Sequence, residues 1–125
     1  MKIEVSNGEL VDKISILSIK LEKIRSNRKL ANIRREHAIL VQILNKINLS
    51  KQDPDYQELH QINSELWAIE DQIRQKEAKK EFDQTFIELA RSIYHKNDQR
   101  FAVKRRINRK TNSLLTEEKE YVDYA

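Results

Sequence analysis

The chain has 125 residues, of which 38% are hydrophobic and 35% charged, and its net charge is +4. It contains no cysteine, which excludes disulfides, thiolate nucleophiles and cysteine-based metal sites. Only one glycine and one proline occur, whereas strands and tight turns need these residue types and long helices exclude them. The composition therefore predicts an all-α protein, organised as a single helical domain over residues 1–125.

A first helix is predicted over residues 7–25. Ser6 precedes it and Glu9 follows three positions later, which is the pattern of a capping box. Its apolar residues recur at spacings of three and four, as in a coiled-coil seam, at Leu10, Ile14, Leu17, Leu21 and Ile24. Ile16 and Ile19 lie on the opposite side, so we expect a second subunit to cover this face.

A turn near residues 25–28 leads into a second predicted helix over residues 29–49. His37 occupies its apolar stripe, and we expect the ring to bond to a neighbouring helix. Asp53 and Pro54 then have the residue types of an N-cap and a first helical position. They predict a third helix over residues 54–80, in which Trp67 is either an interface anchor or a core residue.

A fourth helix is predicted over residues 83–110, followed by a short C-terminal tail over residues 111–125. Four such helices predict a four-helix antiparallel bundle or paired helical hairpins. Because the first helix has an additional apolar face, we expect a homodimer that forms through the first or the third helix.

The apolar stripe of the fourth helix gives way to a polar face. Such a face could bind a phosphate or carboxylate in a bundle interior, or it could simply be the end of a helix that leaves the core. The candidate ligand-binding residues on it are Arg91, Tyr94, Asn97, Lys104, Arg105 and Asn108.

The same helix carries a basic segment with no acidic residue between Gln99 and Thr116. Nucleic acid is one candidate partner, although Phe101 is the only aromatic residue nearby for base stacking. Alternatively, these charges pair with the acidic tail or form a solvated face. The candidate nucleic-acid-binding residues are Arg100, Lys104, Arg105, Arg106, Arg109 and Lys110.

No other motif indicates catalysis or a cofactor. The three histidines lack metal-ligand spacing, and there is no glycine-rich phosphate loop or nucleophile elbow. Asp12 is expected to stabilise the start of the first helix through its dipole, without any active-site role. The N-terminus lacks an apolar leader, so we expect a cytoplasmic protein without membrane contact, metal or cofactor. The leading hypothesis is a non-enzymatic helical protein-interaction or adaptor module. The alternatives are nucleic-acid binding through the basic segment, and a small-anion-binding protein or enzyme with its site along the fourth helix.

Several stretches of the sequence resemble a family of small bacterial proteins of unknown function. They span most of the chain and comprise residues 4–14, 19–24, 65–74, 89–94, 97–100 and 103–108. The resemblance implies a compact helical domain and supplies no activity, ligand or catalytic residue. A looser likeness to helical chorismate mutases, which are dimeric and bind a dicarboxylate, implies Arg91 and Lys104 as charged contacts and Glu70 as a polar partner.

Overall fold

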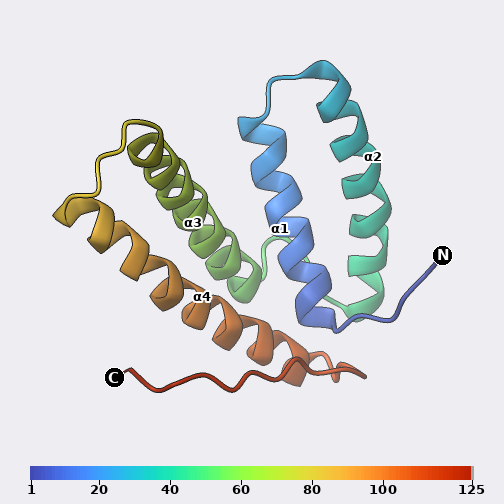
Figure 1. Cartoon of the computed structure of the whole chain (residues 1–125). Coiled ribbons are helices and arrows are strands. Elements are labelled where there is room, and N and C mark those ends of the chain that lie inside the picture. Colours follow the sequence, from blue (N-terminus) through green and yellow to red (C-terminus); the bar gives the residue numbers. More distant parts are fainter. Residues whose placement is uncertain (125) are drawn as a thin grey trace.

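A computed structural model describes residues 1–124 of the chain (Figure 1). Within this range every long element is a helix and there is no strand, so the all-α prediction is confirmed. The elements are α1 (Asn7–Lys23), α2 (Asn27–Leu44), the single 3-10 turn η1 (Asn45–Ile47), α3 (Pro54–Ala78) and α4 (Gln84–Lys110).

The helices begin at side-chain caps. Ser6 Oγ accepts the backbone N–H of Glu9 at 3.1 Å, as expected for α1. The reciprocal half of the capping box is not formed, because the Glu9 carboxylate contacts Lys104 on α4 instead. Asp53 caps α3, and Pro54 is the first residue of that helix. The local sequence therefore sets these starts, while a tertiary contact redirects one capping side chain.

Three helices end earlier than the sequence predicted. α2 stops at Leu44 and not at residue 49, because η1 follows it and Asn48 then adopts a left-handed φ of 56°. α1 ends at Lys23, since Ile24 is already extended. α3 ends at Ala78, two residues before its predicted end. Apolar periodicity continues past the ends of α2 and α1, so it did not reveal where these two helices stop.

The helices form two antiparallel hairpins, α1–α2 and α3–α4 (Figure 1). α1 is central, because it packs against each of the other three long helices. The core lies where the first half of α1 meets the last turns of α2 and α4 and the first turns of α3. Its buried members are Leu10, Val11, Ile14, Leu44, Leu49, Tyr56, Leu59, Ile62, Val103 and Ile107.

The hairpins diverge from this core (Figure 1). Among the described residues, none in the ranges 20–43 and 64–102 is fully buried. We call these ranges the first arm and the second arm. Ile19, expected to face a second subunit, is only 1% exposed within the single chain, while Ile16 is half-buried. In the part of the chain that the structure covers, no helix is long and apolar enough to cross a membrane.

Candidate functional site

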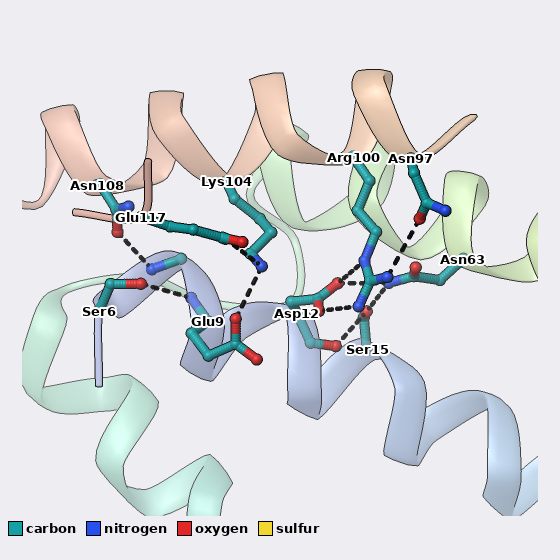
Figure 2. A network of polar contacts seen from close by, with 11 residues as sticks. Ser6, Glu9, Asp12, Ser15, Asn63, Asn97, Arg100, Lys104, Asn108 and Glu117 are labelled. Atoms are coloured by element: carbon teal, nitrogen blue, oxygen red, sulfur yellow. Dashed lines mark hydrogen bonds and ion pairs between the residues drawn. The ribbon is translucent and has the colours of Figure 1, made fainter. Parts of the chain in front are cut away.

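A polar seam joins α1 to α4 beside the core (Figure 2). At its centre the side chain of Asp12 is 1% exposed, and its two carboxylate oxygens contact the guanidinium of Arg100. Arg100 Nε donates to Asp12 Oδ1 at 2.9 Å, and Nη1 donates to Asn97 at 3.4 Å. The hydrogen bonds from Arg100 to Asp12 raise the pKa of the guanidinium, so Arg100 stays charged.

α3 completes the coordination of the buried carboxylate. Asn63 Nδ2 donates to Asp12 Oδ1 at 2.9 Å and to Ser15 Oγ at 2.7 Å. Ser15 Oγ in turn donates to the backbone carbonyl of Asp12 at 2.8 Å. Asn63 is 5% exposed and Ser15 is fully buried. The seam thus ties three helices together with charge-assisted hydrogen bonds.

The second half of the seam centres on Lys104, whose side chain is 8% exposed. Its ammonium lies 2.8 Å from Glu9 on α1 and 2.8 Å from Glu117 in the tail. Burial alone would lower the pKa of Lys104, but its contacts with Glu117 and Glu9 outweigh burial and raise it. Lys104 is therefore a buried cation held between two carboxylates from distant segments.

The only glycine of the chain allows α1 and α4 to cross closely. Asn108 Oδ1 accepts the backbone N–H of Gly8 at 2.6 Å. A Cβ at Gly8 would lie 2.6 Å from the backbone carbonyl of Lys104, which is closer than real Cβ contacts. Gly8 is thus required by the close packing of two helices.

A cavity of about 490 Å³ lies next to the Asp12–Arg100 pair, between α1, α3 and α4. Its wall is apolar at Ile16, Ile19, Leu66 and Trp67. Asn63, Asn97 and Arg100 supply its polar lining, and the charged residues Glu70, Asp71 and Arg74 complete it. The sole tryptophan is therefore half-buried at a cavity and is not a core residue.

The model of a family of unknown function, DUF6165, matches residues 1–124. The chain belongs to this family. The expected membership of a family of unknown function is thereby confirmed, and DUF6165 brings no assigned activity. No curated protein and no solved structure matches the chain.

In this DUF6165 chain the predicted ligand-binding residues do not form one site. Asn97 lines the cavity, whereas Lys104 and Asn108 contact the start of α1. Arg105 lies over the ring of Phe101, at 5.7 Å from its centroid. Arg91 and Tyr94 are exposed on the second arm. Glu70 is paired with Arg74 at 3.9 Å and contacts neither Arg91 nor Lys104.

Four of the six residues in the basic segment already pair with carboxylates. Arg100 and Lys104 do so in the seam. Arg106 contacts Asp55 and Glu58, and Lys110 contacts Asp53 and Asp55. Arg109 is exposed. Residues of α1 thus pair with two of these four cations and the start of α3 with the other two, while Glu117 of the tail adds a second contact to Lys104.

The α1 side of the seam was not predicted from the sequence. Asp12 was expected only to stabilise the dipole at the start of α1, whereas the structure buries it as the partner of Arg100. One signal was present: Asp12 and Ser15 stand three residues apart, so they form a polar stripe on a helix that is otherwise apolar on several faces.

A second cluster joins four segments of the chain. Lys51 Nζ lies 2.8 Å from His37 Nε2 and 3.0 Å from Ser18 Oγ, and Ser18 lies 3.1 Å from the hydroxyl of Tyr56. His37 therefore bonds to α1, as expected, although it is half-buried and not a core residue. Burial lowers the pKa of Lys51, and burial together with the Lys51 charge lowers the pKa of His37.

Among the residues described, no group of three His, Cys, Asp or Glu side chains is arranged to hold a metal ion. Two polar residues that line the cavity, Arg100 and Asn63, already donate hydrogen bonds to Asp12. The apolar side chains of the cavity wall therefore remain as its main contact surface.

Proposed function

We propose that this chain is a non-enzymatic helical protein-interaction module whose docking surface is the cavity between α1, α3 and α4, and whose partner there is a second copy. The observation that carries the proposal is the accessible surface of 8897 Å². A compact monomer of 14.9 kDa exposes about 7000 Å². The excess of about 1900 Å² is as large as a standard protein–protein interface buries in total.

The apolar residues along the open second arm support this proposal. Phe82 is 55% exposed and Ile87 is 46% exposed, and Trp67 is half-buried in the cavity wall. Aromatic residues in partly formed pockets are typical anchors of protein interfaces. The extended ends of the chain also contribute to the excess surface. A second copy therefore need not cover the two arms along their whole length.

The charges on α3 favour a second copy as the partner. The side chains of Glu70 and Arg74 are 49% and 81% exposed, and they lie one helical turn apart next to Trp67. If two α3 helices lie antiparallel across a two-fold axis, Arg74 of each copy can face Glu70 of the other. Such a self-complementary surface is what an isologous dimer requires.

Nucleic-acid binding through the basic segment has less support. A phosphate would have to displace the carboxylates that already contact Arg106 and Lys110. Affinity from counterion release falls when the cations are neutralised within the protein. A cytoplasmic location stays a prediction from the sequence.

Light scattering at micromolar concentration tests the proposal. We expect wild type to have twice the monomer mass of 14.9 kDa. Arg74→Glu should give a monomer, because it places like charges across the two-fold axis. The double variant Glu70→Arg with Arg74→Glu restores the complementarity and should restore the dimer. Arg34→Glu, on the exposed surface of α2, is the matched control and should leave the mass unchanged.

The sole tryptophan gives a second readout. Because Trp67 lines the cavity, its fluorescence should shift to shorter wavelength as the protein concentration rises and the dimer forms. A wild-type monomer at all accessible concentrations would refute the second copy as the partner. A dimer that persists unchanged in Arg74→Glu would place the interface elsewhere.

A further inference from the structure

The tail, residues 111–124, folds back along α4 (Figure 1). It starts against α1, where Ser113 Oγ accepts the backbone N–H of Asn7 at 2.9 Å. Glu117 then contacts Lys104, and the Tyr124 hydroxyl donates to Asp98 near the middle of α4. An acidic, extended segment thus covers the basic half of a helix.

Lys119 lies over the ring of Phe101, but several apolar side chains of the tail are exposed. Leu114 is 85% exposed, Tyr121 is 75% exposed and Val122 is 89% exposed. A segment with so few buried contacts separates from its helix at low energetic cost. The contact between Glu117 and Lys104 is therefore the principal buried anchor of the tail.

The framework under Glu117 is built by α4 and the start of α1. Lys104 and Asn108 are 7% and 4% exposed, and both lie on α4 facing the start of α1. Asn108 Nδ2 is buried without a hydrogen-bond partner. Asn108 lies one helical turn from Lys104, so an unsatisfied donor and a buried ammonium occur side by side on α4, and both favour an acceptor oxygen from another segment.

Glu117 fills this place imperfectly. Its Oε2 lies 2.8 Å from Lys104 Nζ, yet that oxygen makes no hydrogen bond of regular geometry. Figure 2 shows Glu117 and Glu9 both directed at the Lys104 ammonium. Since Glu9 is already present, a dianionic phosphate would be repelled, whereas a single carboxylate is tolerated.

We propose that Lys104, Asn108 and the start of α1 form a binding site for a carboxylate carried on an acidic peptide, and that Glu117 of the tail occupies this site in the resting chain. The tail acts as a tethered competitor, because an intramolecular ligand is present at a millimolar effective concentration. The site lies apart from Trp67, and its test does not depend on the dimer.

A fluorescent peptide with the sequence of residues 113–124 tests the site. We expect it to bind full-length Glu117→Gln about tenfold more tightly than wild type, because the variant removes the tethered carboxylate. Glu118→Gln alters an exposed neighbour in the same segment and should bind as wild type does. A peptide with Gln in place of Glu117 should bind the Glu117→Gln chain no more tightly than it binds wild type.

Equal binding to wild type and both variants would overturn the proposal, as would a peptide that binds equally well with Gln at that position. Lys104→Met, which keeps the apolar stem, should abolish binding to the Glu117→Gln chain. If this variant fails to fold, the altered peptide still decides the outcome. Sodium acetate is then compared with sodium chloride at equal ionic strength as a competitor of the bound peptide. Displacement of the peptide by acetate alone would show that the site recognises a carboxylate by itself. No displacement would show that the site also requires the peptide around the carboxylate.

Discussion

Asp12 illustrates how a single buried charge fixes the arrangement of three helices. Its side chain is 1% exposed, and its charge is answered by Arg100 from α4 and by the Asn63 amide from α3. A buried ion pair adds little net stability over apolar packing, but removal of one partner leaves the other charge uncompensated. The consequence is that both residues must be present together.

We therefore predict that Asp12→Asn destabilises the fold by about 3–5 kcal/mol, because Arg100 is left as an unpaired and partly buried cation. Glu22→Gln removes a carboxylate from an exposed position of α1 away from the cavity and should change stability by less than about 0.5 kcal/mol. Urea unfolding followed by circular dichroism measures both. Similar small effects of the two substitutions would contradict the role assigned to the seam.

His37 gives the molecule a dependence on acid pH. Burial and the nearby Lys51 charge lower its pKa below the value of about 6.5 that it has in the unfolded chain. The unfolded state then binds more protons than the folded state as the pH falls below about 6.5. The contribution of neutral His37 to the free energy of unfolding is fully present above a pH of about 6.5. It is lost progressively as the pH falls towards the pKa of His37 in the folded state.

The corresponding variant is His37→Gln, which should flatten the stability profile between neutral pH and the acid range. The ring faces Lys51 and Ser18, with Tyr56 next to Ser18. His60→Gln removes an imidazole that stacks on Tyr56 and serves as the control, with a profile like that of wild type. Thermal melts across this range give the comparison. Parallel profiles for wild type and His37→Gln would disprove the linkage.

At the scale of elements, the scarcity of glycine shows in the turns. Among residues 1–124, three non-glycine residues have a left-handed φ: Asn48, Lys80 and Asn112. Asparagine tolerates this conformation because its short polar side chain can bond to the nearby backbone, whereas the long side chain of lysine lacks this compensation. Lys80, with φ 56°, follows the C-cap of α3, where glycine is the usual residue.

Lys80→Gly should accordingly stabilise the chain by about 0.5–1 kcal/mol, since it relieves the left-handed strain. The lost contact with Glu77 is an exposed pair at 3.5 Å and counts for little. Lys79→Gly is the matched control: its φ of −89° suits any residue, so glycine there should be neutral or destabilising. A shift in the melting temperature of the same sign and size for both would refute the explanation.

The sequence identified the helices themselves because apolar spacing and caps such as Asp53 are local signals. It overextended α2, because Ile47 and Leu49 continue the apolar pattern through η1 and the left-handed Asn48. Periodicity reports which residues face the core, and both of these pack there. It does not report how the backbone brings them to it.

At the scale of the whole molecule, the polar face of α4 was recognisable from the sequence, but its partners were not. Lys104 and Asn108 were chosen because they interrupt an apolar stripe. Glu9 and Asp12 come from the opposite end of the chain, and a sequence does not state which helix crosses which. The open arms could not be predicted either, since the periodicity of α3 and α4 is the same whether or not another helix covers them.

The seam also determines when this protein can fold during its synthesis. The bond between Gly8 and Asn108 joins residues 100 positions apart, so α1 waits for nearly the whole chain to emerge. At a synthesis rate of about 5–20 residues per second, this delay is several seconds. During that time Asp12 has no counter-ion from α4, and Leu10, Val11 and Ile14 lack Val103 and Ile107. A nascent chain that stops before α4 therefore exposes the residues meant for the core, and it becomes a target for aggregation or proteolysis.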